Sequence, residues 1–514
     1  MMAQPPELFS SPQALLMYLL LFILLLLLLR YLACTTRSSR SHGRLPPSPP
    51  KLPFIGHLHL VGSHPHVSLA GLSEKHAADG LMLLHLGQVR NLVVSSTRAA
   101  EAVLRTHDHV FASRPHSLVV DVIFSGASDV AFAPYGEHWR QARKIITGHL
   151  LSAKKVASLC AAREEEARLV VAKLRQARGP VDLSGMLFAF SNDIVCRAMA
   201  GKFFRAEGRN DVFRELIHMN VAALGGFNLE NCFPSLGNMS MLRRPVLGKL
   251  ERLKKKWHDL LDQIIDEHAA SNSSSLDQDQ ERDFVDALLS LQHDYDLTRE
   301  NIKTILMEMF GAATDTSYVV IEYVLCELLR NPHLMTKLQA EVRGKTPSTQ
   351  ETVKEADLSS MPYLKAVIKE TLRLHPPAPL LIPHMSIDKC DVNGYTIPAE
   401  TRTLVNVWAL CRDTRSWEYA DEFMPERFMD AEAVDFKGRD FQFLPFGAGR
   451  RICPGINFGI ATVEIMLANL LHCFDWELPD GMHKEDIDMT DVYGLTVRRK
   501  EKLFLTPKYV ATCV

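Results

Sequence analysis

A single cysteine near the C-terminus lies in the setting of a metal ligand. Cys453 ends a glycine-rich loop that begins at Phe443, and it precedes an apolar stretch that predicts a long helix. Thiolates bind soft and borderline metals, and the free N–H groups at a helix N-terminus favour the ionised form of a nearby thiol. Pro454 suits the first helical position because it has no N–H to satisfy. A lone cysteine is more often a small buried apolar residue, so Cys453 needs support from its neighbours.

The neighbours of Cys453 supply that support. The loop fits the pattern Phe-x-x-Gly-x-Arg-x-Cys-x-Gly at Phe446, Gly449, Arg451, Cys453 and Gly455, and it closely resembles the haem-binding loop of the cytochrome P450 superfamily. The resemblance implies that Cys453 is the axial thiolate ligand of the iron of haem b and that its electron donation favours O–O cleavage. It also implies that the glycines let the backbone approach the sulfur and that Arg451 pairs with a haem propionate.

Two other stretches resemble the family's contacts with the haem propionates. Trp139 and Arg143 are four residues apart and so share one face of a predicted helix. The resemblance implies that the indole N–H and the guanidinium reach the propionates. Many relatives carry arginine where this chain has His384, which makes this histidine a further candidate donor with a charge that depends on pH.

The centre of a long predicted helix carries small and hydroxyl-bearing residues from Gly311 to Ser317. Such residues loosen the helical hydrogen-bond ladder and make room for a ligand. The stretch resembles the family's oxygen-activation motif, and the resemblance implies that Asp315 and Thr316 relay protons. Ala313 replaces the usual glycine and is expected to narrow the oxygen groove. A simple packing notch is the alternative interpretation.

Three charged residues resemble a structural triad of the family. Glu370 and Arg373 are three residues apart and can pair along a helix, and Arg427 lies in a downstream Pro-Glu-Arg-Phe stretch. An isolated pair of this kind is usually a solvated salt bridge that contributes little. The resemblance implies a buried triad that holds the haem-side core together.

Several apolar or small residues match the family's substrate-contacting regions. They lie in the segment 111–135, in the long helix, in the proline-rich stretch after residue 374 and in a turn near the C-terminus. The resemblance makes the following residues candidates for the substrate pocket: Val122, Phe124, Phe310, Ala312, Leu380, Leu381, Leu495 and Thr496.

Composition and charge restrict the class of protein. The chain has 514 residues, of which 47% are hydrophobic, and its net charge is −2, so it has a large core and no basic excess for binding nucleic acid. Its ten cysteines include no C-x-x-C pair, which argues against a zinc site or a disulfide framework and indicates a reducing compartment. Length alone suggests two or three domains. The resemblance implies instead a mainly α fold with smaller β-sheets, the single large cytochrome P450 haem-thiolate fold, preceded by a membrane anchor helix.

The N-terminal residues predict that anchor. Residues 14–29 are uninterruptedly apolar, and basic residues follow from Arg30 onward, which by the positive-inside rule places the rest of the chain in the cytosol. A cleaved signal peptide is the alternative, but before the apolar run only Glu7 is charged. We expect a single-pass anchor in the endoplasmic reticulum membrane at 1–34, a basic and proline-rich hinge at 35–50 and a catalytic haem domain at 51–514.

Periodicity and turn residues indicate the elements that must position these side chains. Residues 81–96 predict a β-hairpin, 99–106 a helix and 111–135 a long loop. The long helix should begin after Thr298, a good N-cap residue, and end before Pro332.

The motifs together resemble plant A-type membrane-bound cytochromes P450, closest to the grass group with indole and benzoxazinoid-pathway hydroxylases. The resemblance covers essentially the whole chain. It implies a monooxygenase that inserts one oxygen atom from O2 into a small hydrophobic plant metabolite. An indolic or benzoxazinoid precursor is favoured, and terpenoids, phenolics and xenobiotics are alternatives.

The resemblance also implies haem as the cofactor and NADPH as the electron source, through NADPH–cytochrome P450 reductase. A basic face for docking this flavoprotein is expected from Arg143, Lys144, Arg450, Arg498 and Arg499. Two other classes stay open. One is a haem-thiolate isomerase or dehydratase, which needs neither O2 nor reductase, and the other is a non-catalytic membrane haem protein. The presence of Asp315 and Thr316 argues against both.

Overall fold

The computed structural model describes residues 17, 18, 22, 25, 43–77, 79–201, 209–225, 229–237, 240–272, 283–430 and 434–510. The expected anchor at 1–34 therefore lies almost wholly outside the described residues. Of the expected hinge, residues 44–50 form neither helix nor strand, as the four prolines in this stretch predict. The Pro47 carbonyl accepts a hydrogen bond from Leu83 N at 2.9 Å, so the end of the hinge lies against the β-hairpin.

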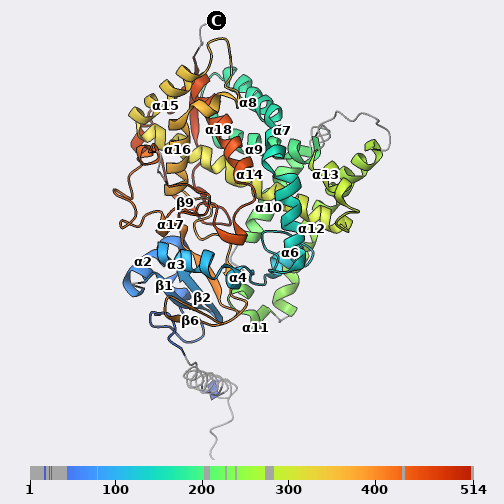
Figure 1. The fold of residues 1–514 in the computed structure, drawn as a ribbon, viewed down its shortest axis with the longest axis vertical. Helices are drawn as coiled ribbons and strands as arrows, with labels where there is room; N and C mark the ends of the chain where they lie inside the picture. The colour runs from blue at the N-terminus through green and yellow to red at the C-terminus, as the bar shows by residue number, and fades with distance from the viewer. Residues whose placement is uncertain are drawn as a thin grey trace, which may run out of the picture.

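Helices make up most of the molecule, and a small sheet lies at one end beside α2 and α3 (Figure 1). This arrangement confirms the expected mainly α architecture. The α-helices of the described residues are α2 (Pro65–His76), α3 (Thr97–Glu101), α4 (Asp108–Phe111), α5 (Leu118–Ile123), α6 (Glu137–Ile145), α7 (Ala153–Ser158), α8 (Cys160–Arg175), α9 (Leu183–Ala200), α10 (Arg209–Gly225), α11 (Pro234–Gly237), α12 (Ser240–Asn272), α13 (Phe284–Leu291), α14 (Arg299–Arg330), α15 (Pro332–Lys345), α16 (Pro362–Leu374), α17 (Val407–Leu410) and α18 (Ile456–Cys473).

Within the described ranges, the strands form four small sheets. They are β1 (Leu81–Leu86), β2 (Val89–Val94), β3 (Val181–Asp182), β4 (His384–Met385), β5 (Cys390–Val392), β6 (Tyr395–Ile397), β7 (Arg402–Val405), β8 (Phe474–Glu477), β9 (Asp491–Val492), β10 (Arg498–Arg499) and β11 (Phe504–Tyr509). The largest sheet has the order β1-β2-β7-β4. The predicted hairpin is confirmed, since β1 and β2 pair antiparallel with Leu81 opposite Val94.

The long helix α14 is the central element of the fold. The Thr298 hydroxyl accepts a hydrogen bond from Asn301 N, and the Asn301 side chain accepts one from Thr298 N, so the start of the helix is capped reciprocally. Asn331 and Pro332 end the helix because proline cannot continue it. Both predicted ends are thus confirmed. Helices α9, α10, α15, α16 and α18 all pack against α14.

The expected helix at 99–106 is confirmed, as α3 followed by a π-helical turn at Ala102–Thr106. One predicted segment differs from the structure. The expected loop at 111–135 contains the short helix α5, because Leu118, Val120 and Ile123 bury their side chains against the core and tertiary packing compensates for weak local periodicity.

Among the described residues, α18 alone is long and apolar enough to cross a membrane, and it is mostly buried inside the molecule. Such burial is typical of a core helix. It therefore gives no independent support to a membrane location.

Candidate active site

The loop before α18 is folded tightly around the sulfur of Cys453. The backbone N–H of Cys453 donates to Phe446 O at 2.9 Å, and Gly455 N donates to Cys453 Sγ at 3.3 Å. Gly449 has φ +64°, and a Cβ there would lie 2.4 Å from Leu104 O. Only glycine fits that position, so the loop can lie directly against the chain near α4.

The N-terminus of α18 does not by itself keep the Cys453 thiol ionised. Burial raises the pKa of this thiol, although the N–H of Gly455 and the charge of Arg143 oppose the effect. The expectation that the helix end holds it ionised is wrong for the protein alone. A bound cation is needed to favour the thiolate.

The middle of α14 is accessible although the helix lies at the centre of the molecule. Ala312 is exposed, Gly311 and Thr316 are partly exposed, and Asp315 is buried. The Thr316 hydroxyl donates to Ala312 O at 2.9 Å. On the facing loop Phe446 and Cys453 are also only partly buried. These accessible side chains indicate an interior space between α14 and the cysteine loop.

Asp315 lies at the edge of that space. Burial raises the pKa of its carboxyl group, while the hydroxyl of Thr496 and the charge of Arg498 lower it. A raised pKa keeps a proton on a carboxyl group closer to neutral pH, which suits a group that passes protons on. The structure therefore brings together Asp315, Thr316 and the C-terminal turn.

The predicted propionate partners are close together, but they bind backbone carbonyl groups. Trp139 Nε1 donates to Val130 O at 3.1 Å, and Arg143 Nη2 donates to Ile452 O at 2.6 Å. Arg451 donates to Ala112 O and Ala133 O, both at 2.6 Å, and to Val130 O at 3.0 Å. The guanidinium of Arg451 also lies over the Trp139 ring, 4.3 Å from its centroid. These side chains clamp the segment before α6 onto the cysteine loop.

His384 is unsuited to the pH-dependent role expected from the sequence. Its Nδ1 lies 2.9 Å from Phe111 O, and burial together with the charges of Arg114 and Arg451 holds the pKa of the imidazole well below its ordinary value. The ring is therefore neutral near pH 7, and a donor at Nδ1 leaves Nε2 as an acceptor.

Arg114 supplies a positive charge beside His384. This buried guanidinium donates to Ile382 O at 2.6 Å and to Pro383 O at 3.0 Å. Sequence reasoning missed Arg114, although an arginine in the apolar setting of Phe111-Ala-Ser-Arg-Pro was a usable signal because a buried arginine needs partners.

Two acids near these arginines, the buried Asp129 and the partly buried Glu308, were also missed. Glu308 Oε2 accepts a hydrogen bond from Val130 N at 2.7 Å, and Asp129 Oδ1 accepts one from Phe132 N at 2.5 Å. Burial and the neighbouring Asp129 raise the pKa of Glu308 to about 8, and burial raises the pKa of Asp129 to about 6. An acid in the apolar run of the long helix was the sequence signal for Glu308.

The expected charge triad is assembled in full. Arg373 donates to both carboxylate oxygens of Glu370, at 2.7 and 2.8 Å, and Arg427 Nε donates to Glu370 Oε1 at 3.1 Å. Glu370 and Arg373 have no exposed side-chain surface. Arg373 also donates to Cys411 O and Ala420 O. The triad therefore joins α16 to the downstream segment that runs from Cys411 to Arg427.

The substrate-pocket candidates fall into two groups. Phe310 stacks on Phe213 of α10 with centroids 4.3 Å apart, and Phe124 stacks on Phe132 at 5.9 Å. Phe310 and Ala312 are on α14, and Thr496 lies beside Asp315 of that helix. Leu495 lies beside Gly225 at the end of α10, and Leu381 lies beside Gly447 of the cysteine loop. Val122 belongs to α5 and Phe124 follows it, and α5 packs against α10. Leu380 is different, because it packs with Leu69 and Leu404 in a separate core under the largest sheet.

The comparison with family models decides the classification. The model described as Cytochrome P450 matches residues 46–506. This chain belongs to the cytochrome P450 family. It is a haem-thiolate monooxygenase, as its relatives are.

Curated maize relatives match nearly the whole P450 chain. An indole-2-monooxygenase of Zea mays is 54% identical over 93% of this chain and 93% of its own length. A 3-hydroxyindolin-2-one monooxygenase is 52% identical over 94% and 93%, and an indolin-2-one monooxygenase is 52% identical over 90% and 89%. Among solved structures, a zebra fish cytochrome P450 with abiraterone has a TM-score of 0.74 and 25% identity, covering 88% of this chain and 100% of that one.

The residues of this P450 fit a haem. Cys453 is partly accessible, and three guanidinium groups, of Arg114, Arg143 and Arg451, lie near one another with pKa values lowered by burial. Buried cations of this kind call for anionic partners. The propionates of haem would supply two anions there.

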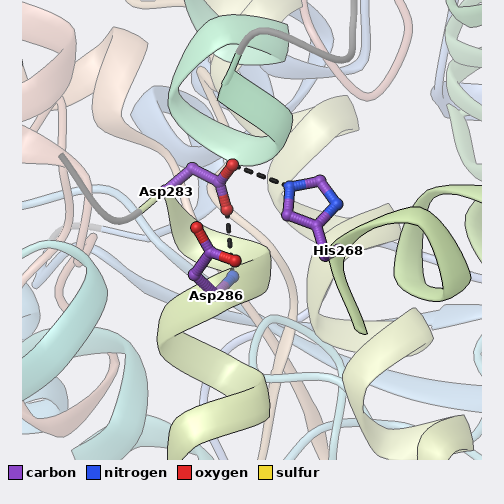
Figure 2. A group of neighbouring side chains, drawn as sticks. All are labelled: His268, Asp283 and Asp286. Carbon is purple, nitrogen blue, oxygen red and sulfur yellow. Dashed lines mark hydrogen bonds and ion pairs between the residues drawn. The ribbon is translucent and has the colours of Figure 1, made fainter. Parts of the chain in front are cut away.

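A second group of possible metal ligands lies away from this P450 site, where α12 meets α13 (Figure 2). His268 Nε2 is 2.8 Å from Asp283 Oδ2, and its Nδ1 is 2.7 Å from Ile264 O. Asp283 Oδ1 accepts a hydrogen bond from Asp286 N at 2.9 Å and caps α13. Because His268 and Asp283 already bind each other and the backbone, we assign this group a structural role.

Proposed function

We propose that this cytochrome P450 hydroxylates a small indolic compound, with electrons that reach it from NADPH through cytochrome P450 reductase at the endoplasmic reticulum membrane. The observation that carries the substrate class is the 54% identity, over 93% of both chains, to a maize indole-2-monooxygenase. Two further relatives of similar identity are named for indolinone substrates, which supports the same class.

The geometry supports specific roles for the chain's own residues. Cys453 ligates the haem, which when bound supplies the dioxygen chemistry. Arg114, Arg143 and Arg451 balance its propionates. Glu308, with its pKa raised to about 8, stays largely uncharged near pH 7, whereas Asp129, with its pKa raised to about 6, is mostly ionised there. The Asp315 carboxyl and the Thr316 hydroxyl pass protons toward the space between α14 and the cysteine loop.

The reductase docks on the cysteine-loop side in this proposal, with a smaller basic face than the sequence suggested. Lys144 and Arg498 are exposed, and Arg450 is exposed but pairs with Asp108 at 2.5 Å. Arg499 is buried and pairs with Glu322 at 3.2 Å, so it is removed from the docking residues. Arg143 is partly buried and binds Ile452 O.

The test is product formation by membranes that carry this chain and reductase, supplied with NADPH and air. Indole, indolin-2-one and 3-hydroxyindolin-2-one form the first panel, and terpenoids and phenolics form the second. Oxygen from labelled O2 should appear in an indolic product and disappear without NADPH. Turnover only in the second panel would refute the indolic class, and rearrangement without NADPH would favour an isomerase.

The membrane location has its own test. The full chain should remain in the membrane pellet after alkaline carbonate washing, whereas a chain that begins at residue 35 should be released in part. Release of the full chain by the same wash would refute the anchor.

A further inference from the structure

Glu308 belongs to the accessible stripe of α14. Between Ile302 and Leu328 of this helix, the residues that keep accessible surface are Glu308, Gly311, Ala312, Ala313 and Thr316. Glu308, Ala312 and Thr316 are spaced four residues apart, which places them on one face of the helix in successive turns. The side chain of Glu308 therefore lies on the face of α14 that borders the interior space.

Electrostatic effects place the carboxyl group of Glu308 near the cysteine loop. Its negative charge raises the pKa of the Cys453 thiol, and the charge of Arg143 lowers the pKa of Glu308 itself. Arg143 donates to Ile452 O, one residue before Cys453. Because charged groups shift each other's pKa only when they are close, the carboxyl group lies between α14 and the loop rather than behind the helix.

One carboxyl oxygen of Glu308 is bonded and the other is available. Oε2 accepts the hydrogen bond from Val130 N at 2.7 Å. Oε1 has no hydrogen-bond partner among the described residues, yet it is not one of the enclosed unpaired atoms, so it keeps accessible surface. The N–H of Ala131 lies near the same carboxyl group and lowers its pKa without reaching hydrogen-bond geometry.

The available oxygen carries a proton at neutral pH. Burial and the neighbouring Asp129 raise the pKa of Glu308 to about 8, so about nine in ten molecules are protonated at pH 7. Since Oε2 accepts from the backbone, the proton is on Oε1 and makes this atom a hydrogen-bond donor. The charged or titratable groups that interact with this carboxyl group are Asp129, Arg114, Arg143, Arg451 and Cys453.

The pocket candidates offer a substrate carbonyl few other donors. The hydroxyl of Thr316 is already bonded to Ala312 O, and that of Thr496 acts on Asp315. A carbonyl that left water for this pocket without a new donor would cost about 1–3 kcal/mol. The remaining candidates are apolar: Val122, Phe124, Phe310, Ala312, Leu380, Leu381 and Leu495.

We propose that the Oε1–H of Glu308 donates a hydrogen bond to a ring carbonyl of the substrate, so that within the indolic class this P450 prefers an indolin-2-one to indole. This inference rests on the proposed function and narrows it, because it names the polar group that a substrate needs. The apolar walls contribute affinity without direction, whereas one hydrogen bond fixes the orientation of the bicycle.

The test is an optical binding titration of the purified, haem-loaded full chain at pH 7 and pH 9, which reads binding without turnover. The ligands are indole, indolin-2-one and N-methylindolin-2-one, which keeps the carbonyl and lacks the N–H. Glu308→Gln keeps a donor that does not titrate, Glu308→Leu removes it, and Glu137→Gln on the exposed surface of α6 is the control. Each preparation must first show the reduced-CO band of the folded enzyme.

At pH 7, wild-type protein and Glu137→Gln should bind both carbonyl ligands about tenfold more tightly than indole, as one buried hydrogen bond implies. At pH 9 only about one molecule in ten keeps the proton, so the preference should shrink to within about twofold. Glu308→Gln should keep the preference at both pH values, and Glu308→Leu should lack it at both. Comparing ligands on one preparation cancels any general loss of stability.

The other outcomes separate the inference from the proposed function. If Glu308→Leu keeps the preference, or if Glu308→Gln loses it at pH 9 as wild type does, the inference is wrong. If Glu308→Leu does not fold, the wild-type series still decides, because a preference that is the same at pH 7 and pH 9 overturns the inference. If indole binds as tightly as the carbonyl ligands, the inference fails and the indolic class survives. If no indolic ligand binds, both fail.

Discussion

Replacing Glu370 by glutamine should disrupt the fold around the site, although the substitution only exchanges one carboxylate oxygen for an NH2 group. The carboxylate accepts four hydrogen bonds, two from Arg373, one from Arg427 and one from Met424 N. Glutamine can accept at one oxygen only, and its NH2 group would point at donors. Two guanidinium groups would then share a site with no negative charge.

The size of the effect follows from burial. Glu370 and Arg373 have 0% exposed side-chain surface, and breaking such a buried pair costs about 3–5 kcal/mol. The entropy of unfolding for a chain of this length is about 1 kcal/mol per kelvin, so the unfolding midpoint should fall by about 3–5 °C at a fixed scan rate. The fraction of protein that gives the reduced-CO band should fall with it.

Glu137→Gln is the matched control. Glu137 pairs with Arg140 at 2.5 Å on the surface of α6, where the two side chains are 82% and 51% exposed. Exposed pairs contribute about 0–1 kcal/mol, so this variant should behave like wild type. The reasoning would be refuted if both variants lowered the unfolding midpoint equally, or if Glu370→Gln lowered it by less than about 1 °C. Burial of the triad would then not explain its contribution to stability.

Three further predictions concern the site itself. Cys453→Ala should abolish the red-shifted reduced-CO band while the far-UV helical signal persists, and survival of the band would remove Cys453 as the ligand. Thr316→Ala should consume NADPH with less product per NADPH than wild type, and unchanged coupling would remove Thr316 from the relay. Because the pKa of Glu308 is raised to about 8, the native state binds its proton more tightly, and this group's stabilising contribution should fall as pH rises from about 4.5 to about 8. Glu308→Gln should flatten that decline in the unfolding midpoint, and an unaltered pH profile would contradict the assignment.

The local elements around the site could be predicted because local chemistry specifies them. Thr298 and Pro332 delimit α14 through a cap and a missing N–H, and the β1–β2 hairpin follows from two apolar runs on either side of a polar turn. Helix α5 could not be predicted, because its six residues form a stable helix only by packing against the core.

The sequence by itself determined the family, the candidate cysteine ligand and the members of the charge triad, because each is encoded in residue types at characteristic spacing within short segments. Only the tertiary structure decided what surrounds them. It placed Arg114 beside His384, Glu308 above Val130 and Asn220 across from Gly311, all pairs whose members lie far apart in the chain. The reason is that burial and charge at a site are sums over several packed elements, and neither the depth of a side chain nor the sign of its pKa shift is a property of its own segment.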